Sequence, residues 1–204
     1  MDKRAIFILI IIFSCNLFYA QNVNYKTSLG FHYGFGHEIK KGDFSHTNSC
    51  YKLELYYTLK TARHFNYELV LQPEFNDGTH QLLNVYFIET NDPDYIEKRQ
   101  KFSNLRNIKE YVLNLGFIIR KPISKTFSVY LLGSVGPMII DNEMERLSKG
   151  FAFSDVFALG FSSKIGQLTF DVRPNIRHVS NGGLQSPNLG FTTFNMEFGF
   201  SFSI

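Results

Sequence analysis

Residues 194–204, Phe-Asn-Met-Glu-Phe-Gly-Phe-Ser-Phe-Ser-Ile, alternate between apolar and polar side chains along their whole length. Successive side chains of a β-strand point to opposite faces, so this stretch predicts a strand with one apolar and one polar face. Phenylalanine makes up most of the apolar face. A strand of this kind suits a closed sheet that turns its apolar face to hydrocarbon and keeps polar groups inside.

The same alternation recurs seven more times earlier in the sequence. In each stretch, aliphatic or aromatic side chains occupy every second position, and polar side chains or glycine lie between them. The predicted strands cover about 25–36, 50–60, 65–75, 109–120, 127–139, 151–165 and 168–180, and the eighth runs to 204. An even number of strands is the rule for bacterial barrels that span a membrane.

The connections between these strands alternate in length. The short ones lie near 61–64, 121–126 and 166, and the long ones cover about 37–49, 76–108, 140–150 and 181–191. Short periplasmic turns and longer outer loops are typical of outer-membrane barrels. We therefore predict an all-β fold, an eight-stranded antiparallel transmembrane β-barrel with both termini on the periplasmic side.

The longest predicted loop contains one further stretch that alternates like a strand, residues 82–90. A ninth membrane strand would break the even count, so we expect this stretch to form a hairpin that protrudes from the outer loop. The remainder of the loop, about 92–109, is rich in charge and predicts a short helix.

A soluble barrel of the lipocalin type is the alternative, because its strands alternate too but place their apolar side chains inside. The composition, with 22 Phe and 11 Tyr at a mean hydropathy of −0.11, argues against membrane helices and fits strands that are apolar on one face only. The membrane barrel is favoured over the soluble one because the sequence ends on a strand of alternating Phe, the kind of C-terminal strand that outer-membrane insertion recognises. Charges of both signs occupy the polar faces, as a narrow, filled lumen requires. The residues predicted to form this lumen network are Glu54, Glu68, Glu110, Asp171, Arg173, Arg177 and Glu197.

The first twenty residues fit a secretory signal peptide. A short charged start precedes the apolar run Ala5–Phe13, which is too short to span a bilayer as a helix, and we expect cleavage after Ala20. An alternative is a lipoprotein with Cys15 as the lipidated residue, although the residues before it match the usual small-residue box poorly. Residues 21–204 are then the outer-membrane barrel domain.

Composition argues against several kinds of ligand. The formal net charge is only +3, which does not indicate a nucleic-acid partner. Beyond residue 20 the sequence holds a single cysteine, Cys50, which excludes an internal disulfide and cysteine-based metal sites. His32 and His37 show no metal-ligand spacing, and no phosphate-binding loop is present, so we expect neither a metal nor a cofactor.

The seventh predicted strand carries the residues that suggest chemistry. Its apolar face, which begins at Leu168, continues through Ile176 into His178 and Ser180, while charged side chains occupy the opposite face. A serine hydroxyl attacks an ester poorly unless a neighbouring base accepts its proton. Side chains two apart on a strand lie roughly 7 Å apart at the backbone, a gap that a histidine ring can bridge. The pattern predicts a nucleophile and its base on the lipid-facing surface.

The surrounding stretch, residues 173–190, reads Arg-Pro-Asn-Ile-Arg-His-Val-Ser-Asn-Gly-Gly-Leu-Gln-Ser-Pro-Asn-Leu-Gly. It resembles the lipid A 3-O-deacylases of the PagL type and the related bacterial acyloxyacyl hydrolase-like proteins, whose signature is His-x-Ser-Asn-Ala-Gly followed by Pro-Asn-x-Gly. Here Gly182 replaces the usual alanine. The resemblance implies that Ser180 is the nucleophile and His178 its general base. It also implies that Asn181 and the Gly183 backbone amide form the oxyanion hole.

This sequence departs from the family at one position. The family has a glutamate 14 residues after the histidine to orient it, and here that position is Thr192. Losing the acid of a triad costs orders of magnitude in rate. Asp155 is a candidate substitute, because a turn at Ile165–Gly166 would place it opposite Ile176 and diagonal to His178. The alternative is that Asp155 lies at headgroup height and is solvated.

The sequence thus predicts an outer-membrane esterase that removes an ester-linked acyl chain from lipid A, or lipopolysaccharide, in the outer leaflet by a Ser/His mechanism. One rival is a catalytically silent barrel of the same family with a lipid-binding or structural role, which the missing acid motivates. The other rival is a surface barrel whose long outer loops bind a partner. The sequence predicts neither the oligomeric state nor the acyl chain removed.

Overall fold

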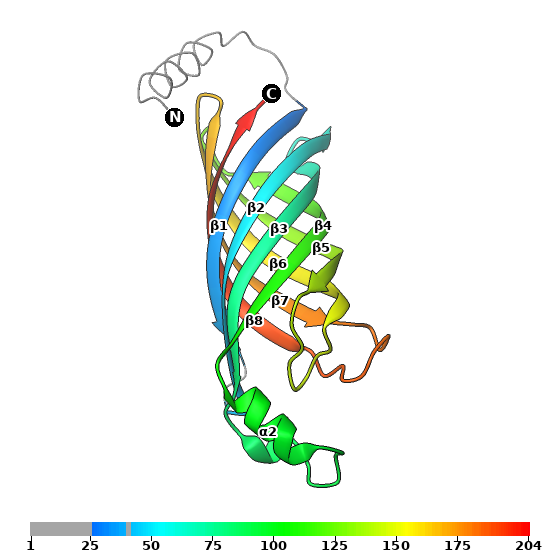
Figure 1. Ribbon diagram of the computed structural model, residues 1–204. Coiled ribbons are helices and arrows are strands. Elements are labelled where there is room, and N and C mark those ends of the chain that lie inside the picture. The colour runs from blue at the N-terminus through cyan, green and yellow to red at the C-terminus, as the bar shows by residue number, and fades with distance from the viewer. Residues whose placement is uncertain (1–25, 40–41) are drawn as a thin grey trace, which may run out of the picture.

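The computed structural model describes residues 26–39 and 42–204, and the predicted signal peptide and Cys15 lie outside them. Eight antiparallel strands, each paired with its neighbours in chain order, close into a barrel when β1 pairs with β8 (Figure 1). This confirms the predicted fold class. The strands are β1 (Thr27–Glu38), β2 (Phe44–Thr61), β3 (Asn66–Leu82), β4 (Arg106–Pro122), β5 (Phe127–Ile140), β6 (Gly150–Ile165), β7 (Leu168–Ser180) and β8 (Phe191–Ser203).

Burial alternates along every strand as a membrane barrel requires. On β4, for example, Leu113, Leu115 and Phe117 are exposed, whereas the residues between them are buried. Aromatic and aliphatic side chains therefore cover the outside of the wall. None of the helices in the described part of the chain is long and apolar enough to cross a membrane.

Charged side chains fill the middle of the lumen. Arg173 contacts Glu54 at 2.5 Å and Glu197 at 2.7 Å, and Arg177 contacts Glu110 at 2.6 Å. All seven residues predicted for the lumen network are buried. Because buried charges are tolerated only when paired, these ion pairs explain how a narrow barrel holds Arg173, Arg177 and their glutamate partners.

Apolar clusters close the lumen on both sides of these charges. Ten buried residues, among them Phe44, Met144, Leu147 and Phe191, pack together at the end with the long loops. A second cluster around Val70, Ile118 and Leu132 fills the lumen nearer the short turns. The barrel is therefore a packed body rather than a channel.

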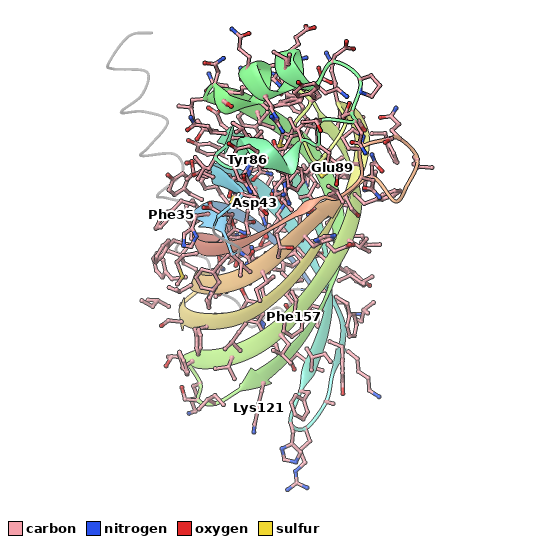
Figure 2. All side chains as sticks on the ribbon, turned by 90° about the horizontal axis from the view of Figure 1, so that it is seen from below. Phe35, Asp43, Tyr86, Glu89, Lys121 and Phe157 are labelled. Carbon is pink, nitrogen blue, oxygen red and sulfur yellow. The ribbon has the colours of Figure 1, made fainter. Side chains whose placement is uncertain are left out.

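The strands β2, β3 and β4 continue beyond the predicted limits into an arm that carries α2 (Tyr95–Ser103) (Figures 1 and 2). Figure 2 shows Tyr86 and Glu89 at this end of the molecule and Lys121 at the other. The arm was missed because its strands face water on one side, so the alternation that marks a membrane strand is weaker there.

The protruding hairpin predicted for residues 82–90 is wrong. Residues Val85–Phe87 form a short 3₁₀ helix, η2, which the Asn84 side chain caps by accepting a hydrogen bond from the Tyr86 N–H. Leu82, Ile88 and Phe102 pack into one cluster, so apolar spacing that resembled a strand instead packs η2 against α2. The helix predicted in the rest of the loop is confirmed.

Candidate active site

His178 and Ser180 lie at the loop end of β7, on the outside of the barrel wall. His178 is exposed and Ser180 is half-buried, whereas Arg177 and Val179 beside them are buried in the lumen. Ile176, the next outward residue toward the membrane centre, is also exposed. The alternation of the strand thus places both candidate catalytic side chains on the outer surface of the barrel, together with the apolar side chains.

Two neighbouring strands flank the imidazole. Thr192 of β8 lies directly opposite His178, and its Oγ1 is 3.0 Å from His178 Nδ1. No described residue bonds Nε2 of the same ring, which leaves this nitrogen available for another partner. The residue at the family's acid position therefore does contact the histidine, through a hydroxyl rather than a carboxylate.

Asp155 lies on the other side of His178, and its predicted register is wrong by two residues. The β6–β7 turn consists of Gly166 and Gln167, because Ile165 pairs with Leu168, and Asp155 is therefore directly opposite His178 rather than Ile176. Directly opposed residues have Cβ atoms about 4.5–5.5 Å apart. The carboxylate is exposed and bonds no described residue, so it is adjacent to the imidazole without a hydrogen bond to it.

Gly190 fills the space behind both reactive residues. Its φ of 61° lies in the left-handed region, and a Cβ there would lie 2.3 Å from the Val179 carbonyl oxygen. The same Cβ would be 3.4 Å from His178 Cε1 and 3.4 Å from Ser180 Cβ. Only glycine fits this position, and its backbone therefore forms part of the surface that sets the two side chains. The motif signalled this glycine, but only the structure shows what it touches.

Asn181 and Gly183, predicted to form the oxyanion hole, are bonded to each other. The Gly183 N–H donates to Asn181 Oδ1 at 3.0 Å, and Asn181 Nδ2 donates to Ser148 Oγ and the Gln185 carbonyl, both at 2.9 Å. Asn181 is fully buried. Of the amides just beyond Ser180, the Gly182 N–H is the one that bonds no other described group. The motif asparagine therefore organises the β7–β8 loop in this structure.

The β5–β6 loop, residues 141–149, packs against the β7–β8 loop. Leu147 bridges to Asn188, and the Ser148 N–H donates to the Pro187 carbonyl. Sequence reasoning missed this contact, because nothing in the spacing of either loop indicates that they meet. The reactive residues thus depend on a loop that lies about 30 positions away in the sequence.

A hollow of about 580 Å³ lies on the apolar outside of β2–β5. Pro73 and Pro137, which lack the N–H that a strand needs, lie in its wall together with Leu113. Pro73 pairs with Leu113, and the pairs on either side of Leu113 align it with Pro137. Pro137 in turn pairs with Phe153, and Phe153 with Ser180, so one row across the sheet joins the hollow to the serine.

Within residues 26–39 and 42–204, no group of three or more His, Cys, Asp or Glu side chains is arranged to hold a metal ion. Glu145 in the β5–β6 loop instead pairs with His80 of β3 at 2.8 Å. Burial raises the pKa of Glu145, but the hydrogen bond from His80 and its charge outweigh this effect and hold the pKa below the ordinary value of 4.5.

Comparison with known proteins decides the family. The model of the family described as "Lipid A 3-O-deacylase (PagL)" matches residues 100–201, half of the sequence. The chain belongs to the PagL family. The match includes Asp155, His178, Ser180 and Thr192, and it confirms the resemblance that the sequence motif indicated.

The fold agrees with this assignment. The structure of "the outer membrane enzyme PagL" has a TM-score of 0.50 at 13% identity, covering 83% of this chain and 97% of that chain. Neisserial surface protein A gives 0.47 at 10% identity (87% and 96% covered), and Ail of Yersinia pestis gives 0.42 at 11% (87% and 96%). Identities this low show likeness of fold alone. A comparison with curated protein sequences finds no match.

As a PagL-family member, the chain departs from its family's pattern where Thr192 replaces the expected glutamate. In the structure the Thr192 hydroxyl oxygen lies 3.0 Å from His178 Nδ1. What it lacks is the negative charge, and Asp155 is the carboxylate that stands across from the same imidazole.

Proposed function

We propose that this PagL-family barrel is an outer-membrane esterase that removes an ester-linked acyl chain from lipid A. The observation that carries the proposal is the position of His178 and Ser180, side by side on the outer wall, with His178 Nδ1 3.0 Å from the Thr192 hydroxyl. An ester in the outer leaflet can reach these groups without leaving the membrane.

Ser180 Oγ attacks the acyl carbonyl while His178 Nε2 accepts the serine proton. In the tautomer with its proton on Nδ1, the imidazole donates to Thr192 Oγ1, which leaves the Nε2 lone pair free to act as the base. As the acyl C–O bond breaks, the imidazolium protonates the departing sugar oxygen, which leaves as a hydroxyl. Water, activated by the same histidine, releases the fatty acid from Ser180.

Asp155 stabilises the imidazolium in this proposal. Thr192 orients the ring but supplies no charge, whereas Asp155 lies opposite His178 on β6 and is unpaired within the described chain. A carboxylate close to an imidazolium in a poorly hydrated setting favours the charged form. The loss of the family's glutamate is therefore compensated in part rather than completely.

The developing oxyanion is stabilised by Asn181 and the Gly183 amide, as the family motif implies. Without substrate the Gly183 N–H donates to Asn181 Oδ1 at 3.0 Å, and Asn181 Nδ2 donates to Ser148 Oγ and the Gln185 carbonyl. Substrate binding must therefore exchange these bonds for donation from both N–H groups to the acyl oxygen. The neighbouring Gly182 N–H, unbonded within the described loop, is a third donor at the same turn.

The hollow on β2–β5 supports an acyl-chain path. The row from Ser180 to Pro73 crosses from β7 to β3, roughly 19 Å at about 4.8 Å per strand, over apolar side chains. The long loops and the arm lie beyond the same end of the barrel as Ser180 (Figure 1). With these loops outside the cell, the ester meets Ser180 at the level of the outer leaflet.

The second candidate is a silent barrel of the same family that binds lipid without cleaving it. The neutral Thr192 at the acid position and the mutual hydrogen bond of Asn181 and Gly183 favour it.

Mass spectrometry of lipid A from bacteria that produce the protein separates the two candidates. We expect a species lighter by one acyl chain, absent in Ser180→Ala cells and present in Ser163→Ala cells. Ser163 is a matched control, because it is an exposed serine near the other end of the same wall. Lipid A that is identical in cells with wild-type and Ser180→Ala protein would support the silent barrel.

A further inference from the structure

Arg146 of the β5–β6 loop forms hydrogen bonds with both backbone groups of Gly190, the N–H and the carbonyl. The Arg146 carbonyl accepts hydrogen bonds from the N–H groups of Leu189 at 2.8 Å and Gly190 at 3.2 Å. The Arg146 guanidinium donates from Nη1 to the Gly190 carbonyl at 3.3 Å. A single residue thus bonds both the N–H and the C=O of the glycine that backs His178 and Ser180.

The guanidinium is itself fixed by three other contacts. It lies over the Phe44 ring at 3.9 Å and the Phe87 ring at 4.9 Å, and its Nε donates to Glu145 Oε1 at 3.1 Å. Cation–π contacts of a half-buried Arg, together with a charge-assisted hydrogen bond, restrict such a side chain strongly. Glu145 is in turn held by His80 at 2.8 Å.

The Gly190 backbone lies directly behind the reactive pair. A Cβ at this position would clash with the Val179 carbonyl oxygen at 2.3 Å and would lie 3.4 Å, an ordinary contact distance, from His178 Cε1 and Ser180 Cβ. A shift of this backbone away from the wall would remove the support behind the imidazole and the serine. The bonds of Arg146 to Gly190 therefore link the β5–β6 loop to the backbone behind the two side chains.

We propose that Arg146 is a positioning residue for His178 and Ser180, acting through Gly190. The proposal rests on the proposed esterase function for its catalytic meaning, whereas its structural part concerns the His178 ring alone. Arg146 reaches neither reactive side chain directly. Loss of the guanidinium removes its bond to the Gly190 carbonyl, while the two backbone bonds to the Arg146 carbonyl remain. Gly190 then shifts, so the reactive pair is misaligned while the lipid-facing wall that binds the acyl chain is unchanged.

The test compares Arg146→Ala and Arg146→Lys with the control Arg106→Ala. Arg106 also donates to the β5–β6 loop, to the Glu143 carbonyl at 2.7 Å, and also lies over an aromatic ring, that of Phe102, but it has no contact with Gly190. Purified full-length barrels in detergent are checked for folding by their heat-modifiable gel mobility. Turnover is then measured on lipid A micelles, and the His178 ring signal, assigned with His178→Gln, is measured by NMR.

We expect kcat to fall about tenfold to a hundredfold in Arg146→Ala with KM little changed, since small misplacements of reacting groups have effects of this size. The Arg146→Lys variant keeps a positive charge over the Phe44 and Phe87 rings, so its kcat should lie between those of the wild-type protein and Arg146→Ala. The His178 signal should shift in Arg146→Ala and not in Arg106→Ala. Folded Arg146 variants with wild-type kcat and an unchanged His178 signal would overturn the proposal.

The two proposals fail differently. If the wild-type barrel leaves lipid A intact while Arg146→Ala still shifts the His178 signal, the positioning role holds and the esterase function fails. If Arg146→Ala does not fold, the Arg146→Lys variant decides: its His178 signal and kcat must differ from those of the wild-type protein, and equality with wild type contradicts the role of Arg146.

Discussion

The two faces of β7 differ in how their polar groups are paired. Inside, Arg173 and Arg177 are fully buried and matched by Glu54, Glu197 and Glu110. Outside, His178 has one hydroxyl partner through Nδ1 and an unbonded Nε2. Groups that are satisfied in this way contribute to structure, whereas incompletely satisfied groups are free to react. Because the alternation separates the two sets, chemistry on the outer face can change without disturbing the lumen.

The sharpest test of this separation is His178→Gln. The substitution removes the base, so we expect deacylation to fall by at least about a thousandfold, as loss of a member of a catalytic unit does. The free energy of unfolding, measured in urea, should change by less than about 0.5 kcal/mol, because the side chain is exposed. A large loss of stability in this variant would show that the outer face also holds the barrel together.

The inner face should respond in the reverse way. Arg173→Met leaves Glu54 and Glu197 without their main partner and should lower the free energy of unfolding by about 3–5 kcal/mol. The fraction that remains folded should deacylate at the wild-type rate. Lys164→Met, which removes an exposed cation near the other end of the wall, is the control and should change little. Equal stabilities of the two variants would contradict the role given to the lumen network.

Thr192→Glu would restore a carboxylate on the outer face, at the position where the family has its acid. The new carboxylate would replace a hydroxyl that already lies 3.0 Å from His178 Nδ1, and it adds the missing charge. We expect kcat to rise about tenfold to a hundredfold, part of the effect that an orienting acid has in a triad. The control is Thr47→Glu, which adds the same charge on the exposed surface of β2. The neighbouring Thr193 is buried and is therefore unsuitable as a control position. An unchanged kcat would mean that charge at this position does not limit the reaction.

Asp155→Asn tests the proposed division of the acid's two functions. It removes the carboxylate opposite His178 while keeping its size, and we expect kcat to fall about tenfold because the imidazolium loses a neighbouring negative charge. Combined with Thr192→Glu, the same change should have a much smaller effect. Full activity of the single variant would mean that Asp155 is merely solvated.

The smallest effect is expected in the β5–β6 loop. Since the pKa of Glu145 is lowered in the folded protein, its contact with His80 stabilises the loop above the ordinary value of 4.5. This contribution is lost as the pH falls below 4.5 through the lowered pKa. Glu145→Gln should remove about 1 kcal/mol of loop stability at pH 7 and little at pH 3. Loop proteolysis measured at both pH values checks this, and an equal effect at both would contradict it.

Much of the barrel could be predicted because its strands meet hydrocarbon on one side and a polar lumen on the other. That contrast marked all eight strands and placed Arg173 and Ser180 on opposite faces. This contrast is weaker in the arm, where the outer face meets water. There the strand-like stretch predicted at residues 82–90 contains the helix η2 instead. The predicted β6–β7 turn, at Ile165–Gly166, lies one position too early in the sequence. This error shifts every pairing between the two strands by two residues, so the predicted partner of Asp155 is Ile176 instead of His178.

Sequence reasoning about the candidate site reached only as far as the local motif. The outward placement of His178 and Ser180 follows from period two, but the contact of Arg146 with Gly190 joins two loops whose meeting has no local signal. The predicted roles of Asn181 and Gly183 ignored the internal bonding of the loop, which polar groups near a tight turn adopt whenever a partner is within reach.

The account depends most on Ser180 being an activated nucleophile on the lipid-facing wall. A phosphonylating ester probe, which labels only activated serines, tests this when peptide mass spectrometry locates the label and deacylation is followed in parallel. The account predicts label on Ser180, inactivation in proportion to labelling, and neither reaction in His178→Gln. Deacylation that continues with Ser180 fully labelled, or that persists in Ser180→Ala, would contradict it.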